Sequence, residues 1–224
     1  MGDRQSYGGE RKLSDIGEIA DRSATIQEFA AGYFHRLTAV LESMDLDRLA
    51  ALAQELDEAR QAGQTVFIAG NGGSATTAST MSNDLGFDIL KKTGTQHAFR
   101  IHPLTDTVGA ITAIGNDVGF ERIFVDQLRV SYRPGDKLIV ISASGNSPNL
   151  VLAAEWVKAA GGTVLGLLGF TGGRLLEICD IAVHFRSHPG EYGPVEDAHL
   201  VVNHVLAHWY QAKLGAAEDH RGTS

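Results

Sequence analysis

The chain has 224 residues, 43% of them hydrophobic and 21% charged, which suits one folded domain of ordinary size and excludes a disordered or fibrous protein. Its 19 basic and 27 acidic residues give a formal charge of -8, and no basic block offers a footprint for nucleic acid. No apolar run nears the roughly 20 residues of a membrane helix, so we expect no membrane contact. The N-terminal segment lacks the apolar stretch of a signal peptide, and the single Cys179 can form no internal disulfide. We therefore expect a cytoplasmic protein.

Polar segments without a regular period stand at both ends of the chain. We expect residues 1–18 to form a flexible arm and 217–224 a flexible tail, with a single domain over 19–216. Apolar residues at helical spacing predict one helix from Ile26 to Leu41 and another from Leu49 to Leu56, which Gly63 ends. Two helices therefore precede the first strand.

Five short apolar runs follow, at 66–69, 110–114, 137–141, 163–169 and 181–185, with helical patterns between them. Continuous apolar strands separated by helices are typical of a parallel sheet covered on both faces. The pattern predicts a doubly wound α/β fold with about five strands. Asn116 and Asp117 are expected in a turn after the second run, and a last helix is expected from about Pro194 to Leu214, with Trp209 packed on its apolar stripe.

Two of these strands lead through a small-residue loop into a helix, as VFIA-GNGGS and KLIVI-SASGNS. A helix amino terminus at the end of a parallel strand offers unpaired N–H groups to an anion. In the second loop, Ser142, Ser144 and Ser147 add hydroxyl donors, and Pro148 suits the first helical position. We expect a phosphate monoester there, although these residue types also serve as ordinary turn and cap residues.

Neither loop carries a nucleotide-binding signature. The Walker pattern needs a lysine that the second loop lacks, and the first loop does not fit the dinucleotide pattern of three spaced glycines. The sequence therefore predicts no nucleotide cofactor.

Six segments occur in a specific order: GNGGSA (70–75), LTD (104–106), AIGNDVGFERIF (113–124), ISASGNSPN (141–149), GFTGG (169–173) and VEDAHLVVNHVL (195–206). Together they resemble the sugar isomerase (SIS) domain family, and within it the phosphoheptose isomerases, which interconvert sedoheptulose 7-phosphate and D-glycero-D-manno-heptose 7-phosphate. The resemblance spans roughly residues 25–214. It implies a homotetramer of doubly wound α/β subunits with active sites at subunit contacts.

The resemblance also implies roles for individual residues. The serine-rich loop would hold the sugar phosphate through Ser142, Ala143, Ser144 and Ser147. The first loop, the Thr-Asp pair and the last helix would line the sugar through Asn71, Gly72, Gly73, Ser74, Thr105, Asp106 and Glu196.

The family's acid–base pair is a glutamate after the first loop and a histidine on the last helix, positions that Asp84 and His204 hold here. Isomerisation through an enediol moves a proton between C1 and C2, so it needs a base near the acidic C–H and an acid near the carbonyl oxygen. Aspartate is one methylene shorter than glutamate, so we expect rate or substrate preference to differ. Asp84 could also serve as a cap or salt-bridge partner, and His204 as a structural histidine.

Zinc-binding members of the family use a histidine four residues before the glutamate, a glutamine, and the histidine on the last helix. Thr80 stands at the first of these positions and Glu196 at the second. Asp84, Glu196 and His204 could still supply the three protein ligands of a catalytic zinc, so the resemblance leaves a zinc cofactor open.

Two other functions remain open. One is a non-catalytic SIS protein that binds a phosphosugar or a protein partner and regulates, which Thr80 in place of histidine favours. The other is a different reaction on a phosphosugar, such as elimination at an amino-sugar ether, because that reaction also begins with proton abstraction next to a carbonyl.

Overall fold

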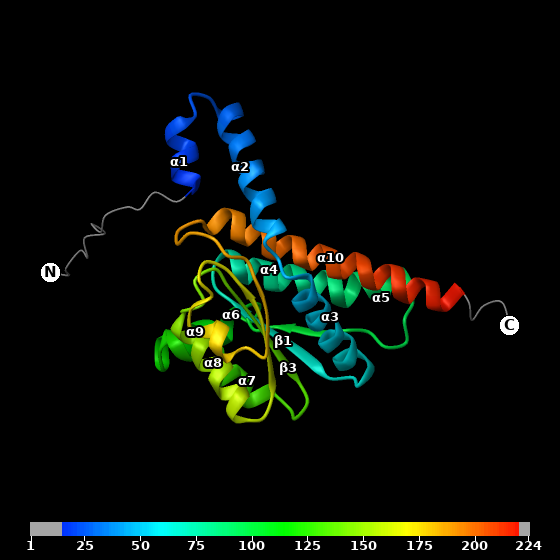
Figure 1. Cartoon of the computed structure of the whole chain (residues 1–224). Coiled ribbons are helices and arrows are strands. Elements are labelled where there is room, and N and C mark those ends of the chain that lie inside the picture. Colours follow the sequence, from blue (N-terminus) through cyan, green and yellow to red (C-terminus); the bar gives the residue numbers. More distant parts are fainter. Residues whose placement is uncertain (1–14, 220–224) are drawn as a thin grey trace.

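The centre of the molecule is a sheet of five parallel strands (Figure 1). The structure is a computed structural model that describes residues 15–219, with the side chains of 15–215. The strands run in the order β2-β1-β3-β4-β5, so the winding reverses between β1 and β3, where doubly wound sheets bind their ligands. Their bounds are β1 (Thr65–Gly70), β2 (Arg100–Pro103), β3 (Lys137–Ser142), β4 (Thr163–Leu168) and β5 (Ile181–His184).

The predicted strand at 110–114 is wrong, whereas the other four are confirmed. Residues 110–114 lie in α6 (Val108–Asp117), and Asn116 and Asp117 form its last turn. A short apolar run fits a strand and a helix equally well, so its periodicity could not decide. The missing strand is β2, which lies at the sheet edge and, among the strands of residues 15–219, pairs only with β1. Its four residues are mostly in contact with solvent and include no apolar run.

Both faces of the sheet are covered, because alternate strand residues point into two separate cores. Ile68 and Ile139 face one core, while Phe67 and Leu138 face the other. This two-sided burial explains the continuous apolar runs. The first core is covered by α3 (Leu46–Gln61), α4 (Gly73–Met81), α5 (Ile89–Thr93) and α10 (Tyr192–Asp219), and the second by α7 (Val125–Ser131), α8 (Pro148–Ala159) and α9 (Gly173–Ile178).

The N-terminal helices are α1 (Asp15–Arg22) and α2 (Ile26–Glu42). Thr25 caps α2, because its hydroxyl accepts from the Glu28 N–H over 3.2 Å. Residues 15–18, which were predicted to belong to a flexible arm, are helical and begin α1. Residues 217–219, predicted to belong to a flexible tail, are the last residues of α10. Residues 1–14 and 220–224 lie outside the described residues.

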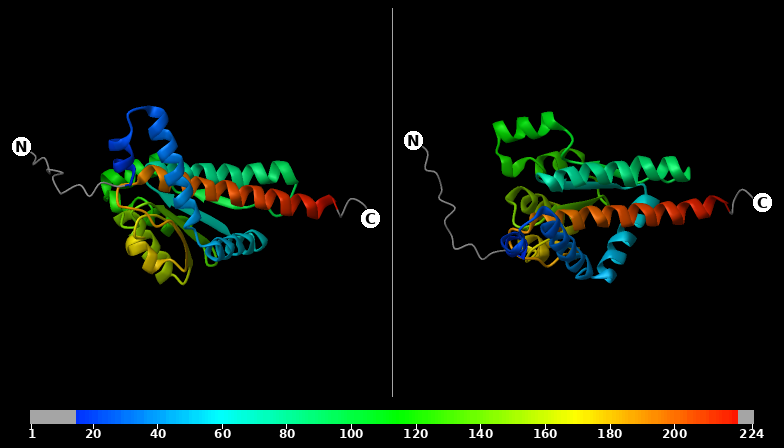
Figure 2. Two further views of the ribbon diagram at one scale, coloured as in Figure 1. Left: turned by 45° about the horizontal axis from the view of Figure 1, so that its top comes forward. Right: turned by 90° about the horizontal axis from the view of Figure 1, so that it is seen from above.

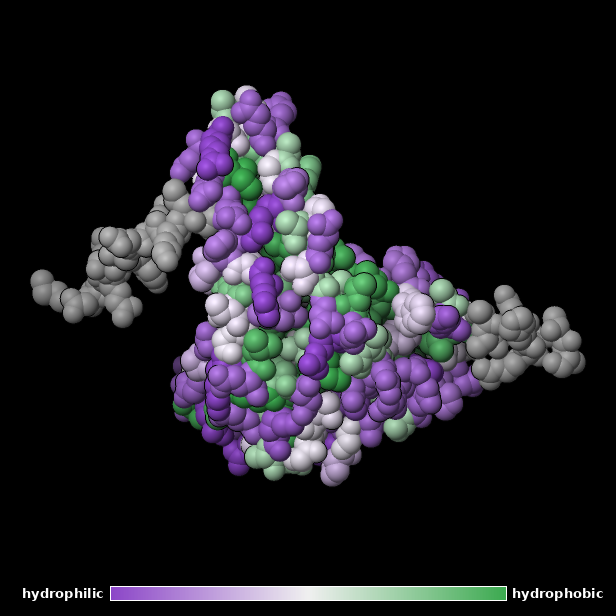
Figure 3. Space-filling view, in the orientation of Figure 1, coloured by the Kyte–Doolittle hydropathy of each residue, from purple (hydrophilic) through white to green (hydrophobic). Residues whose placement is uncertain are grey.

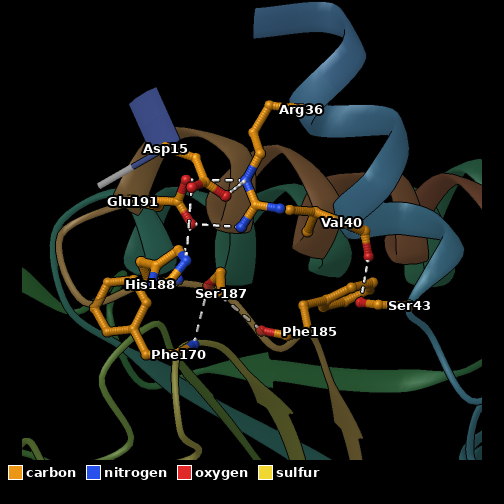
Figure 4. Close-up of polar contacts among 9 residues, drawn as sticks. All are labelled: Asp15, Arg36, Val40, Ser43, Phe170, Phe185, Ser187, His188 and Glu191. Carbon is orange, nitrogen blue, oxygen red and sulfur yellow. Dashed lines mark hydrogen bonds and ion pairs between the residues drawn. The ribbon is translucent and has the colours of Figure 1, made fainter. Parts of the chain in front are cut away.

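Polar contacts fasten α2 to the start of α10. In Figure 4 the guanidinium of Arg36 points at the carboxylates of Glu191 and Asp15. Arg36 donates to both oxygens of Glu191, over 2.9 and 2.6 Å, and Tyr33 donates to Asp197 over 2.5 Å. Burial would raise the pKa of Glu191, but the hydrogen bonds from Arg36 and from the His188 backbone N–H lower it overall. The first turns of α10 are thus held in place.

The helical stretch after β1 and the last helix lie side by side (Figure 2). This stretch comprises α4, the π-helical segment η1 (Ser82–Asp88) and α5. None of the described helices is long and apolar enough to cross a membrane. Trp209, expected to pack, is instead 52% exposed on α10.

Candidate active site

The serine-rich loop after β3 is stabilised largely by its own side chains. The buried Ser142 accepts from the Gly145 N–H over 3.0 Å, and Ser144 accepts from the Asn146 N–H over 3.3 Å. Ser147 is the N-cap of α8, but its hydroxyl makes no capping bond. Ser142 therefore shapes the loop, while Ser144 and Ser147 keep hydroxyl donors for a ligand.

The turn at 169–173 supports this loop from the side. Gly145 has a φ of +67°, and a Cβ there would lie 1.9 Å from the Gly172 carbonyl oxygen, so only glycine fits. Asn146 accepts from the Arg174 N–H over 2.9 Å. The buried Ala143 packs with Phe170 and Val195. The loop is thus fixed against the turn and against the start of α10.

The first loop is joined to the serine loop's helix by a reciprocal amide pair. Asn71 donates to Asn149 over 3.0 Å, and Asn149 donates back over 2.9 Å. Asn149 is only 2% exposed. The amide of Asn71, expected to line the sugar, therefore bridges β1 and α8 across the switch point of the sheet, and we assign it a shaping role.

The two glycines of the first loop meet different needs, a positive φ at Gly72 and a close approach at Gly73. Gly72 has a φ of +55°, and a Cβ on Gly73 would lie 2.3 Å from a carboxylate oxygen of Glu196. Glu196 thus reaches from α10 to the amino terminus of α4. Burial and the neighbouring Asp197 raise the pKa of Glu196. Ser74 is buried against Gly70 rather than open to a ligand.

The Thr-Asp pair follows β2 at the same edge of the sheet. Asp106 accepts hydrogen bonds from Ser79 of α4 and, over 3.2 Å, from Thr105. Asp106 is exposed and Thr105 is half-buried. These contacts fix the Asp106 carboxylate next to α4 while leaving it open to solvent.

The predicted acid–base residues meet, although they are far apart in sequence. Asp84 lies in η1 and His204 in α10, and His204 Nε2 is 3.8 Å from Asp84 Oδ2. The side chain of Asp84 is 20% exposed and that of His204 is 53% exposed. Asp84 Oδ2 also accepts from Asn203 over 2.7 Å, and Oδ1 accepts from Asn83 over 3.0 Å. π-Helical segments within helices often mark functional sites. A carboxylate and an imidazole at this spacing can exchange protons with a ligand bound beside them.

The residues present do not fit a zinc site. Within residues 15–215, no three His, Cys, Asp or Glu side chains gather closely enough to hold a metal ion, so Glu196 does not join Asp84 and His204. Thr80 donates its hydroxyl to the Thr76 carbonyl over 3.0 Å. The three-ligand set suggested by the resemblance is not assembled in this chain.

Sequence reasoning missed two buried asparagines of the site, Asn149 and Asn203. Each is buried in a helix whose other buried residues are mostly apolar. A polar residue on an apolar helical face was the available signal, because such a side chain needs a buried partner.

Comparisons with known proteins agree with this architecture. The model of the SIS domain matches residues 32–169. The chain belongs to the SIS domain family. A phosphoheptose isomerase from Trichlorobacter lovleyi is 38% identical over 184 residues, which cover 81% of this chain and 91% of that protein. One from Chlorobaculum parvum is 33% identical, with 83% of this chain and 88% of that protein covered.

A solved structure gives the same picture of this SIS domain protein. The phosphoheptose isomerase from Neisseria gonorrhoeae superposes with a TM-score of 0.75 at 26% identity, covering 84% of this chain and all of that one (100%). The expected family and the doubly wound α/β fold are both confirmed.

Proposed function

We propose that this chain is a phosphosugar aldose–ketose isomerase that converts sedoheptulose 7-phosphate into D-glycero-D-manno-heptose 7-phosphate. The observation that carries the proposal is the pairing of Asp84 with His204 at 3.8 Å. Relatives named phosphoheptose isomerase, 38% and 33% identical over most of the chain, support the choice of a heptose phosphate.

The chemistry follows from the positions of the polar groups. The hydroxyls of Ser144 and Ser147 and the N-terminal N–H groups of α8 bind the phosphate. In the ketose-to-aldose direction, Asp84 removes a proton from C1, and protonated His204 donates a proton to the carbonyl oxygen O2. Asp84 then returns its proton to C2 of the enediol as His204 accepts the proton from O1. Both residues end as they began, and no oxidant or reductant is consumed.

A zinc cofactor remains a hypothesis, and the mechanism above does not require one. Thr80 and the separation of Glu196 from Asp84 and His204 argue against a site of the family's kind within one chain. Activity that is unchanged after dialysis against a chelator would agree with a metal-free reaction. Loss of activity that added Zn²⁺ restores would establish a metal requirement.

We also propose that the chain forms a homo-oligomer, and that it is a tetramer. Figure 3 shows apolar surface along α2 and over the middle of α10, where Phe34 is 64% and Trp209 52% exposed. An apolar groove of about 500 Å³ lies between α3 and α10 and includes Leu46, Leu49 and Leu214. Exposed apolar surface of this kind is typical of subunit contacts. Sedimentation equilibrium should give four times the 23.9 kDa chain mass; a monomer would contradict the proposal.

The experiment for the function is a coupled assay of three ketose phosphates: sedoheptulose 7-phosphate, fructose 6-phosphate and ribulose 5-phosphate. We expect aldose formation from the heptose and at least tenfold lower kcat/KM for the others, because the remote part of a substrate contributes binding energy to the reaction. Preference for a shorter sugar would overturn the heptose assignment while retaining the isomerase class.

A regulatory role is the second candidate, and the replacement of the usual histidine by Thr80 favours it. A regulator would bind sedoheptulose 7-phosphate in calorimetry and form no aldose. An isomerase would do both, so the two measurements on one preparation separate these functions.

A further inference from the structure

A buried amide lies directly behind the acid–base pair. Asn203 immediately precedes His204 on α10, its side chain is fully buried at 0% exposure, and its Nδ2 donates to Asp84 Oδ2 over 2.7 Å. The same carboxylate oxygen lies 3.8 Å from His204 Nε2. One oxygen of Asp84 therefore accepts from a buried, uncharged donor and also lies near the imidazole.

The other end of this amide is unpartnered. Within the described residues, Asn203 Oδ1 has no hydrogen-bond partner, and neither ring nitrogen of the buried His199 has one of normal geometry. Unsatisfied buried polar atoms are costly, so a polar side chain kept at such a position calls for an explanation. The contact with Asp84 sets the orientation of this amide, because only its NH2 end can donate to a carboxylate.

The position of Asp84 explains why such support matters. Asp84 lies in the π-helical segment η1, and its second oxygen is bound by Asn83, which is exposed to solvent. A hydrogen bond from an exposed amide competes with water, whereas a buried bond to a carboxylate is stronger and more directional. Asn203 is thus the contact that fixes the carboxylate.

We propose that Asn203 is a positioning residue for the isomerisation, because its buried amide holds the Asp84 carboxylate in the orientation from which it exchanges a proton with the sugar. This inference rests on the proposed isomerase function. Since proton transfer is sensitive to displacements of about 1 Å, loss of the amide lowers kcat by about 10- to 100-fold. The phosphate is bound by a different loop, so KM changes by less than about threefold.

The test compares Asn203→Leu with a matched control on the same helix pair. Gln211 of α10 also donates an amide to a carboxylate of η1, Asp88, over 3.2 Å. Gln211→Leu therefore removes the same kind of bond between the same two segments, but away from Asp84. With sedoheptulose 7-phosphate as substrate, we expect the kcat loss in Asn203→Leu alone. Equal losses in the two variants, or a rise in KM with unchanged kcat, would overturn the positioning role.

A second variant covers the case in which leucine at this buried position prevents folding. Asn203→Ser keeps a small polar group there and withdraws the donor from Asp84, so the same selective fall in kcat is expected at an unchanged melting temperature within a few degrees. Wild-type kcat retained in a folded Asn203→Ser variant would contradict the inference. An inactive wild-type protein would instead refute the proposed function itself, so the two failures are distinguishable.

Discussion

The serine loop and the acid–base pair are built in different ways. The loop over 142–147 is stabilised by bonds among its own residues and by one neighbouring turn. The pair joins Asp84 of η1 to His204 of α10, which are brought together only when the two helical segments pack. The conformation of the proposed phosphate loop therefore depends on contacts within the loop and with one turn, whereas the proposed acid–base pair depends on the packing of two distant helical segments.

The largest expected effect comes from removing either member of the pair. Asp84→Asn or His204→Ala should lower kcat by about 10³-fold, within the range of a general acid or base, and leave phosphosugar binding in place. Steady-state kinetics with sedoheptulose 7-phosphate, together with calorimetric binding, measures both. Normal turnover by Asp84→Asn would show that Asp84 is not the base.

Within the serine loop, we expect the largest effect from substituting Gly145. Gly145→Ala places a Cβ at a φ of +67° and 1.9 Å from a backbone oxygen. We expect it to destabilise the fold by about 3 kcal/mol or more and to weaken substrate binding, since the loop must rearrange. Urea unfolding and KM are the measurements. A variant with wild-type stability and KM would mean that the loop adopts another conformation.

The buried His199 of α10 should make the stability of the fold depend on pH. Burial lowers the pKa of His199 to about 4, with the Leu168 carbonyl acting in the opposite direction, against about 6.5 in an unfolded chain. Between these values the unfolded state binds more protons, so stability falls as the pH drops from about 6.5 to about 4. Unfolding free energy should decrease by about 2 kcal/mol between pH 7 and pH 5 from this group.

The matching variant is His199→Leu, measured by urea unfolding at one protein concentration. Its stability should lose that part of the pH dependence. An unchanged slope between pH 5 and pH 7 would show that His199 takes up a proton in the folded protein as readily as in the unfolded chain.

The smallest expected effects come from substituting Ser144 and Ser142 of the serine loop, and the two substitutions should differ. Ser144→Ala removes a hydroxyl available to the phosphate and should raise KM by about tenfold with little change in kcat. Ser142→Ala removes the acceptor of the Gly145 N–H, so it should lower the melting temperature as well. If both variants changed only KM, the shaping role of Ser142 would be wrong.

The contrast between local and long-range contacts also explains how much of the structure could be predicted from the sequence. Strands buried on both faces, such as β3 with all six residues buried, leave continuous apolar runs that are visible in the sequence. The edge strand β2 leaves none, and the apolar run of α6 imitated a strand. Trp209 was expected to pack because helical periodicity does not reveal which apolar face remains uncovered within one chain.

Within the site, residue types at loops were predictable and partnerships were not. The serines and the Asp84–His204 pair were expected from motifs, and the structure places that pair together. The amide pair of Asn71 and Asn149 spans 78 residues, and Asn203 reaches Asp84 across 119. Contacts over such separations depend on packing that no local pattern encodes.

The most direct test of the account is deuterium incorporation into sedoheptulose 7-phosphate in D₂O, followed by NMR, for the wild type and Asp84→Asn. We expect deuterium at C1 or C2 together with new aldose for the wild type, and neither for the variant. Bound sugar without deuterium incorporation or product in the wild type would contradict it, and the protein would then be a phosphosugar-binding regulator.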